Sequence, residues 1–419
     1  MSAFLKDLIK VFNFVKYLFS VNEKKNLIHS EVLFICGDSS RTILIENKRY
    51  SHLVDTLNEK LFSLNINTLT IASPPAIIFG DDAFGNVHSI NGLYFRARLV
   101  KNIYSKLLRN SQAGNAIMGG MWANILSKVR PKLIIGIQPE IELCLIAKNK
   151  NIPIFDLQHG ILSDEGYYGL QCRERINQEG WPTSILCWDQ NSKNWVDKNC
   201  KNFVSSTVIG NPWLNRFLNK SENDTVVNSF SNIESIKLTE NGKFSILITL
   251  QWGAEEQNIQ GAILGMPQQL VQIVKETSNI YNWFIRIHPI QILNLGKGEI
   301  FENLCRSFNG FYNINWDWAT DMPLPIVLSK MQLHLTSHSA CTIEASYFNI
   351  KTGLFNSNSK MLYDYFSNQI KEGNAEIVEL STLNDWIKKN FEDLNTQIVN
   401  KGSEFENFLD LVISIVRKN

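Results

Sequence analysis

Short runs of apolar and β-branched residues alternate with longer helical stretches, and this alternation constrains the fold more than any other feature of the sequence. Several runs are almost wholly apolar, which is typical of parallel strands covered on both faces. In the first half of the chain the strand-like runs lie at residues 31–36, 68–72, 132–137, 153–157, 184–188 and 206–209. Helical segments lie between them, so this half is predicted to fold as strand–helix units around a doubly wound sheet.

A second series of the same kind follows a polar stretch of the chain. Its strand-like runs lie at residues 244–250, 283–287, 311–314, 332–336, 351–355 and 375–379. We therefore predict an α/β protein of two doubly wound, Rossmann-like domains with a cleft between them and a helical tail. The first domain is expected at residues 1–215, the linker at 216–239 and the second domain with its tail at 240–419. Ligands of such sheets bind at the carboxyl ends of the strands.

Charge and cysteine content narrow the classes of partner and cofactor. The chain has 41 Lys and Arg against 40 Asp and Glu, a net charge of +1, which gives no basis for a nucleic-acid partner. The seven cysteines include no pair at the CxxC spacing, which favours buried free thiols in a reducing compartment over a zinc site. No Asp-x-Asp triplet is present to hold a cation on a diphosphate.

The first 25 residues are apolar but interrupted by lysines and an aspartate. No uncharged run reaches the length that spans a membrane, and no secretory signal is visible, so a cytoplasmic location is expected. The apolar positions fall on one helical face, which predicts an amphipathic helix at residues 1–25. This helix either packs on the protein's own core or rests on the inner face of the cytoplasmic membrane.

The strand-like run at 153–157 leads directly into Gln158, His159 and Gly160. This position places an imidazole at the carboxyl end of a parallel strand, and the glycine permits a tight turn beside it. His159 is a candidate phosphate ligand, a hydrogen-bond partner of a substrate hydroxyl or a general base. The alternative is a histidine that caps the strand and has only a structural role.

Asp164 and Glu165 follow a few residues later, ahead of Tyr167. Two adjacent carboxylates on a loop near a strand end can supply a general base, although the sequence does not decide which of the two it would be. The alternative is a solvated acidic turn of the kind that is common on protein surfaces.

The run at 283–287 carries Arg286 and ends at His288 and Pro289. Proline forces the backbone to leave the strand and fixes the turn, so the imidazole at His288 is expected to be held rigidly. Alternation along the strand places Arg286 on the same face as His288. The pair suits a phosphate or a leaving oxygen, whereas a His-Pro without a ligand is the alternative.

The run at 332–336 leads into Ser337, His338 and Ser339, and a helix is expected from about residue 340. Small hydroxyl residues can cap this helix, and its exposed amino end can bind phosphate. Glu344 lies about one turn into the helix, where a carboxylate can bind ribose hydroxyls. An ordinary capped helix with a surface glutamate is the alternative.

In their order along the chain, these motifs resemble bacterial GT-B glycosyltransferases that build capsule and lipopolysaccharide sugars. The resemblance lies in the Gln-His-Gly segment with Tyr167 behind it, the Gly-Asn-Pro at 210–212, His288-Pro289, and Ser337 to Ser339 followed by Glu344. It implies a GT-B fold, a nucleotide-sugar donor bound by the second domain, and a glycan or lipid-linked glycan acceptor near Gln158, Gly160 and Tyr167. It also implies that the chain needs neither a metal nor another cofactor, with which the missing Asp-x-Asp triplet agrees.

A narrower similarity is to bacterial polysialyltransferases and Kdo transferases, which use CMP-linked acidic sugars. It implies that Asp164 or Glu165 is the base that deprotonates the attacking hydroxyl and that His288 binds the CMP phosphate. The chain departs from that pattern in two places: His338 separates the two serines, and the acidic pair stands directly behind Gln-His-Gly.

Three other activities stay open at the level of sequence. A sugar-nucleotide epimerase shares the two-domain architecture, and a CDP-polyol phosphotransferase of the teichoic-acid type also uses a His-Pro element. The third alternative is a non-catalytic polysaccharide-assembly protein, since a fold alone does not establish activity.

Overall fold

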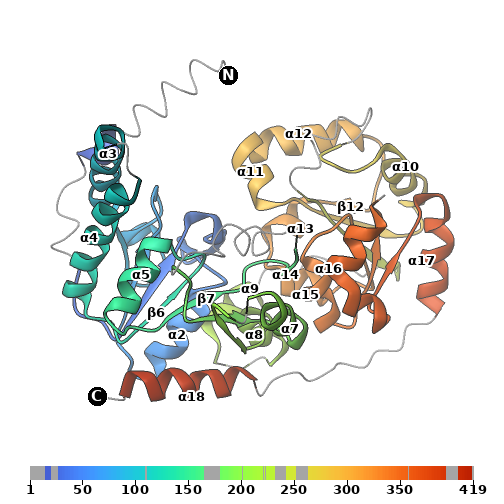
Figure 1. Ribbon diagram of the computed structural model, residues 1–419. Coiled ribbons are helices and arrows are strands. Elements are labelled where there is room, and N and C mark those ends of the chain that lie inside the picture. The colour runs from blue at the N-terminus through green and yellow to red at the C-terminus, as the bar shows by residue number, and fades with distance from the viewer. Residues whose placement is uncertain are drawn as a thin grey trace. The chain divides into compact units, whose positions relative to one another are not determined.

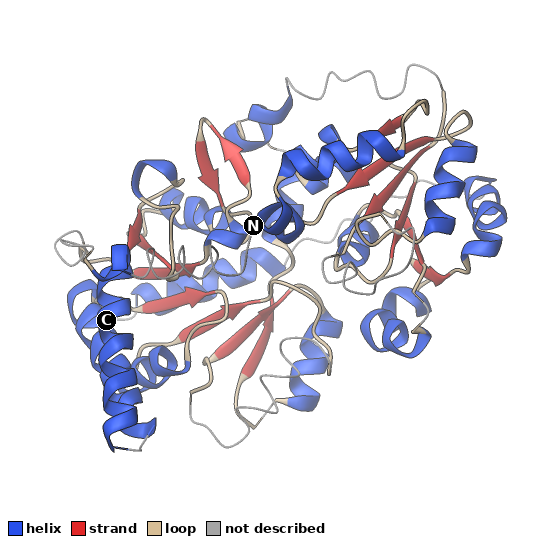
Figure 2. Cartoon of the chain, turned by 90° about the horizontal axis from the view of Figure 1, so that it is seen from above, coloured by secondary structure: helices blue, strands red, loops and turns tan. Residues whose placement is uncertain are grey.

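The computed structural model describes residues 15–19, 27–108, 111–164, 180–200, 202–219, 221, 223–231, 242–251, 263–356, 358–392 and 404–417. The chain divides into two compact units (Figure 1). Unit 1 comprises Met1–Trp213 together with Gly402–Asn419, and unit 2 comprises Leu214–Lys401. Each unit is built around a parallel sheet with helices packed against it (Figure 2).

Unit 1 holds a seven-stranded sheet in the order β5-β4-β1-β6-β7-β8-β9, with every neighbouring pair parallel. The strands are β1 (Val32–Cys36), β4 (Thr68–Ala72), β5 (Val87–Ser89), β6 (Leu133–Gly136), β7 (Ile154–Leu157), β8 (Ser184–Cys187) and β9 (Ser205–Val208). The six strands expected from the sequence are therefore confirmed. The short edge strand β5 and the hairpin of β2 (Ile43–Ile45) and β3 (Lys48–Tyr50) were not expected.

The central strand β1 is apolar throughout because both of its faces are covered. Val32 and Phe34 pack on one side of the sheet with Leu57 of α2 (Asp55–Ser63). Leu33 and Ile35 pack on the other side, in a cluster that also contains residues of α4 (Ser111–Val129) and α5 (Ile141–Asn149). Alternate side chains of a strand point to opposite faces, so one apolar run supplies two cores.

The last helix corrects the prediction for the tail. Helix α18 (Glu404–Arg417) belongs to unit 1, and its Phe408, Leu409 and Val412 are buried in the same cluster as β1. The sequence assigned this helix to the second domain because it follows that domain along the chain. Its apolar face fits a sheet-covering helix in either unit, so the sequence pattern alone could not choose between them.

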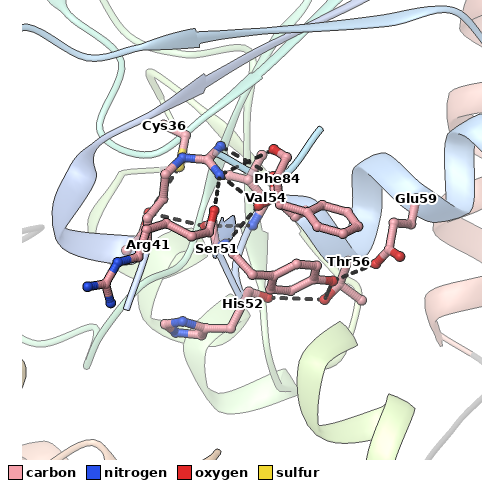
Figure 3. A network of polar contacts seen from close by, with 12 residues as sticks. Cys36, Arg41, Ser51, His52, Val54, Thr56, Glu59 and Phe84 are labelled. Carbon is pink, nitrogen blue, oxygen red and sulfur yellow. Dashed lines mark hydrogen bonds and ion pairs between the residues drawn. The ribbon is translucent and has the colours of Figure 1, made fainter. Parts of the chain in front are cut away.

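A buried polar network stabilises the segment that follows β1 (Figure 3). Arg41 is 2% exposed and Asp55 is fully buried, and the two form a two-pronged ion pair with N–O distances of 2.8 and 3.3 Å. The guanidinium also donates to the carbonyl oxygens of Arg49 and Phe84, at 3.1 and 3.5 Å, and Asp55 accepts from the backbone N–H of Ser51 at 2.7 Å. The pair therefore fastens the β2–β3 hairpin to the first turn of α2.

Unit 2 holds a six-stranded, fully parallel sheet in the order β12-β11-β10-β13-β14-β15. The strands are β10 (Ser245–Thr249), β11 (Asn282–Arg286), β12 (Ile314–Asn315), β13 (Leu333–Thr336), β14 (Lys351–Leu354) and β15 (Ala375–Ile377). Helices α10 (Gln268–Thr277), α11 (Pro289–Leu295), α12 (Lys297–Ser307), α13 (Asp317–Asp321), α15 (Cys341–Tyr347), α16 (Ser359–Lys371) and α17 (Leu383–Glu392) connect the strands or follow them. The predicted second doubly wound sheet is confirmed.

The stretch expected as a linker at 216–239 is more ordered than predicted where it is described. It contains the end of α8 (Pro212–Leu218) and all of α9 (Thr225–Ser231). Val226 and Phe230 of α9 are buried, and Asp224 accepts from Arg216 Nε at 2.6 Å. A few apolar residues in a polar stretch were thus enough to anchor a short helix.

Three further expectations concern thiols and membrane segments. Cys200 is disulfide-bonded, which contradicts the expectation that all cysteines are free; five other described cysteines are free thiols. Of the predicted amphipathic helix at residues 1–25, only residues 15–19 are described, and 15–18 are helical. In the described part of the chain, no helix is long and apolar enough to cross a bilayer.

Candidate functional site

The carboxyl ends of the strands in unit 2 bring the predicted site residues to one edge of the sheet. Strand β10 lies between β11 and β13, and all three run parallel. His288 comes shortly after β11 and Ser337 directly after β13, while Asn356 lies just beyond β14. Residues that are far apart in the sequence therefore share the edge where ligands of such sheets bind.

His288 is locked in position by the helix that it begins. It is the N-cap of α11, and its Nδ1 accepts from the backbone N–H of Ile290 at 3.2 Å. Its own N–H donates to Oε1 of Gln291 at 3.1 Å, which completes a capping box, and Pro289 is the first residue of the helix. Because Nδ1 accepts, the neutral ring carries its proton on Nε2, where it can donate to a phosphate or a leaving oxygen.

Arg286 holds the segment around α13. Its Nη1 donates to the carbonyl oxygens of Ala319 and Met322, at 2.5 and 2.7 Å. The sequence placed this guanidinium among the donor ligands, whereas the structure shows that these two of its hydrogen bonds go to backbone carbonyls. Burial raises the pKa of Glu344 on α15, and the charge of Arg286 partly offsets that rise.

Glu344 lies in the first turn of α15, as predicted. Burial raises the pKa of its carboxyl group to about 7, against the opposing effects of Arg286 and a hydrogen bond with Cys341. Burial also raises the pKa of the Cys341 thiol to about 12. Near neutral pH the carboxyl group of Glu344 therefore exists in both protonation states and can accept or donate a hydrogen bond.

Replacing Glu344 by glutamine is expected to change how stability depends on pH. The folded pKa of about 7 lies above the ordinary value of 4.5, so the folded state holds this proton more tightly than the unfolded state does. The wild type should lose stability relative to Glu344→Gln as the pH rises from 4.5 to 7, with no further loss above that window. Melting temperatures of both proteins across this range test the prediction, and a constant difference would contradict it.

Ser337 and His338 form a small polar cluster with Asn356. The Nδ2 of Asn356 donates to Ser337 Oγ at 2.8 Å, and Ser337 Oγ lies 2.9 Å from His338 Nδ1. Either partner can donate in the Ser337–His338 contact, because the hydroxyl has one proton and two acceptor lone pairs. Burial lowers the pKa of His338, so the ring is neutral at neutral pH.

Ser339 has a different role from its two neighbours. It is buried, and its Oγ accepts from the backbone N–H of Cys341 at 3.3 Å. This bond orders the turn before α15, but the N-cap of the helix is Ala340, which makes no side-chain capping hydrogen bond, so the hydroxyl cap expected from the sequence is not formed.

In unit 1, His159 follows β7 and is held by a residue that the sequence reasoning missed. The Nε2 of Gln138 lies 2.5 Å from His159 Nε2, and the backbone N–H of Gln138 donates to Asp156 Oδ1 at 2.9 Å. Gln138 has a φ of 52°, a strained value for a residue with a side chain, at the end of β6. Burial lowers the pKa of His159 to about 4, so the imidazole is neutral at neutral pH.

Gln158 is committed to internal hydrogen bonds. It is 1% exposed, its Nε2 donates to Gly160 O and Ser192 Oγ, and its Oε1 accepts from the backbone N–H of Trp188. These bonds tie the turn after β7 to the start of α7 (Gln190–Asn199). Among the residues that the structure describes, a side chain added at Gly160 would meet nothing within 4 Å.

Of the two predicted carboxylates, Asp164 is described and Glu165 lies outside the described residues, as does Tyr167. Asp164 is exposed, and its Oδ1 accepts from Nε1 of Trp195 on α7 at 3.0 Å. Its carboxylate is therefore oriented and reachable by solvent. Within the described ranges, no three His, Cys, Asp or Glu side chains are grouped so that they could hold a metal ion.

Comparison with known proteins establishes the fold. No protein-family model and no curated protein sequence matches the chain. UDP-GlcNAc 2-epimerase from Neisseria meningitidis, bound to UDP-GlcNAc, matches with a TM-score of 0.55 and 12% identity over 91% of this chain and 99% of that one. The same enzyme from Methanocaldococcus jannaschii matches with a TM-score of 0.54 and 14% identity, over 91% of this chain and 99% of that one. The wall teichoic acid polymerase TagF matches with a TM-score of 0.56 and 12% identity, over 99% of this chain and 96% of that one.

Identities this low show a shared fold and leave activity undecided. This chain shares its fold of two Rossmann-like units with these GT-B proteins, and each match covers at least 91% of both chains.

Proposed function

We propose that this chain is a glycosyltransferase that moves a sugar from a nucleotide-activated donor to a growing bacterial surface glycan, without a metal ion. The observation that carries the proposal is the strand-end edge of unit 2. There, His288 is held with its Nε2 proton outside the capping interaction, and the Ser337–His338–Asn356 cluster follows the neighbouring strands.

His288 would donate from Nε2 to the donor phosphate or to the leaving oxygen. Such a donor is effective because its orientation is fixed before the reaction, so no reorganisation is needed as charge develops. Ser337 and His338 would add hydrogen bonds to the same phosphate group, and Glu344 would bind the ribose hydroxyls. A CMP-linked acidic sugar is the donor suggested by the order of the motifs.

Unit 1 would supply the general base that deprotonates the acceptor hydroxyl. The pKa of His159, about 4, removes the advantage that an imidazole ordinarily has over a carboxylate at neutral pH. Asp164 and Glu165 are therefore the first candidates, with His159 next. Gly160 and Tyr167 would contact the acceptor, while the buried Gln158 would shape the turn.

A ligand screen followed by a transfer assay tests this function. Thermal shifts with CMP-, UDP-, GDP- and CDP-linked compounds are expected to identify one nucleotide class, because a ligand that binds only the native state raises its apparent stability. With that donor and a panel of glycan acceptors, Asp164→Asn or Glu165→Gln should lose turnover while donor affinity survives. If neither variant loses turnover, His159 becomes the base; if no nucleotide binds, the proposal fails.

An epimerase is the second candidate, because two of the matching structures are UDP-GlcNAc 2-epimerases that are covered over 99% of their length. Incubation with the nucleotide sugar alone, followed by NMR of the sugar ring, separates the two functions. A donor that is converted without an acceptor would favour the epimerase.

A CDP-polyol phosphotransferase is the third candidate, because the TagF polymerase matches over 99% of this chain and one of its structures was soaked with CDPG. Such an enzyme would leave phosphate in the product, whereas a glycosyltransferase would not.

A further inference from the structure

The turn that follows β7 is fastened to helix α7 by side chains from one face of that helix. Ser192 and Trp195 are three residues apart on α7, so their side chains point the same way. Ser192 Oγ accepts from Gln158 Nε2 at 3.1 Å, and Trp195 Nε1 donates to Asp164 Oδ1 at 3.0 Å. One helix face therefore holds both ends of the segment 158–164.

Apolar packing holds the same segment between these two hydrogen bonds. Leu162 is buried in a cluster with Ile185 of β8 and Val196 of α7, and the partly buried ring of Trp195 packs against this cluster. Side chains in such a close-packed cluster keep one orientation. The direction of the indole N–H is therefore set by the packing of unit 1, and Asp164 meets a donor that is already in place.

The contact between Trp195 and Asp164 is suited to orienting a carboxylate that solvent can reach. Asp164 is exposed, and an exposed side chain ordinarily samples several rotamers. The indole N–H only donates, so it holds a carboxylate oxygen without competing for a proton that the carboxylate is to accept. An ionised carboxylate has about four lone-pair sites, so it can keep the indole bond and still take a proton from a hydroxyl group.

We propose that Trp195 is a positioning residue that orients Asp164 as the general base toward the acceptor hydroxyl. The inference rests on the proposed function and narrows it, since it selects Asp164 among the three candidate bases. Asp164 takes the hydroxyl proton, the hydroxyl oxygen forms a bond to the anomeric carbon of the sugar, and the phosphate oxygen leaves that carbon with the electron pair. Trp195 only fixes the direction of the carboxylate, and a misplacement of about 1 Å can cost about 10²-fold in rate.

Trp195→Phe tests this role, because it removes the N–H and keeps an aromatic ring against the cluster. With the donor class identified among the CMP-, UDP-, GDP- and CDP-linked compounds and its acceptor, we expect kcat to fall about 10–100-fold. Donor affinity should stay at the wild-type value, since the donor residues lie in unit 2. The melting temperature should change little, because Asp164 is exposed and water can replace the indole.

Trp386→Phe is the matched control. Trp386 Nε1 donates to Glu376 Oε2 in unit 2, also at 3.0 Å, so this variant removes the same kind of hydrogen bond away from the candidate base. Trp386 is buried, so the variant also shows whether a loss of ring packing affects turnover by itself. Its kcat should equal that of the wild type.

Two further measurements show whether Trp195 acts through Asp164. Trp195→Phe/Asp164→Asn should turn over no more slowly than Asp164→Asn alone, because the indole then has no base to orient. NMR of the protein labelled with ¹⁵N-tryptophan measures the contact without any activity. Trp195→Phe identifies the indole resonance of Trp195, and Asp164→Ala should shift that resonance.

Three results would overturn the inference: a kcat of Trp195→Phe equal to that of the wild type, an additive loss in the double variant, or an indole resonance that Asp164→Ala leaves in place. A lower melting temperature of Trp195→Phe with an unchanged kcat would make the contact a purely structural fastening of the segment. The proposed function fails by a different result, namely a wild type that transfers no sugar although its indole resonance responds to Asp164→Ala.

Discussion

Replacing Arg41 by methionine is expected to destabilise unit 1 by about 3–5 kcal/mol, because it leaves the carboxylate of Asp55 buried without its ion-pair partner. Both side chains of this pair are 0% exposed, so solvent cannot take over the lost interaction. Burial already raises the pKa of Asp55 to about 6, although Arg41 opposes the rise. Without Arg41 the carboxyl group can be buried more easily as the neutral acid, so the loss should be larger above neutral pH than in mild acid.

Hydrogen exchange localises this effect, which matters because a chain of two units need not unfold in one step. Protection should fall in peptides that cover the β2–β3 hairpin and α2, while peptides from unit 2 stay unchanged. Arg306→Met is the matched control: Arg306 pairs with Glu302 at 3.1 Å, but both side chains are more than 70% exposed. Exposed pairs contribute little, so no measurable change is expected there.

A double variant separates the ion pair from the packing. Arg41→Met/Asp55→Leu removes both charges, and a buried pair replaced by apolar groups often costs little. We expect it to recover most of the stability that Arg41→Met loses. If the double variant is as unstable as the single one, the stabilisation comes from the hydrogen bonds to Arg49, Phe84 and Ser51. The ion pair itself then contributes little.

Replacing His288 by alanine is expected to weaken donor binding and to reduce transfer by about 10²–10³-fold, the usual effect of losing one preorganised hydrogen-bond donor. The same change also removes the cap of α11, which costs about 1 kcal/mol of stability. His288→Asn distinguishes the two effects, because asparagine is among the best N-cap residues but has no imidazole. Its melting temperature should stay near that of the wild type.

The two variants together decide the role of His288. If both lose donor binding and turnover, the imidazole contacts the donor as proposed. If His288→Asn binds and turns over normally while His288→Ala does not, the histidine is only a helix cap. Isothermal titration with the nucleotide found in the screen measures binding without relying on turnover, so the test still applies if the reaction differs from the one proposed.

The sequence predicted most of the parallel strands well because most are short apolar runs with a distinct boundary. The exception is β12, expected at 311–314 and observed at Ile314–Asn315. Strand β4 was predicted with its observed limits, Thr68–Ala72, and β1 within one residue. The edge strand β5 escaped because it has only three residues, Val87–Ser89, and one of them is a histidine. A strand this short is recognised from its pairing with β4, which no local pattern reveals.

The candidate site residues were chosen by the same rule, which takes the residues that directly follow predicted strands. His288 and Ser337 follow predicted strands, and so does Asn356, which a stricter application of the rule would have included. Gln138 directly follows the predicted run at 132–137, so the same rule would have included it, although its positive φ and its contact with His159 are visible only in the structure. His334 lies fully buried between Thr249 and Thr352, at 2.8 and 3.0 Å, which is a structural role that the sequence did not indicate.

The position of α18 has a consequence for how the chain acquires its structure during synthesis. The face of β1 that carries Val32 and Phe34 is covered in part by Phe408 and Val412, and all of unit 2 is translated between them. Domains generally fold as they leave the ribosome, in order from the amino terminus. Unit 1 therefore cannot complete its fold before unit 2 has been synthesised. Until α18 emerges, part of this apolar face of the sheet stays exposed, and a chaperone could bind it during that interval.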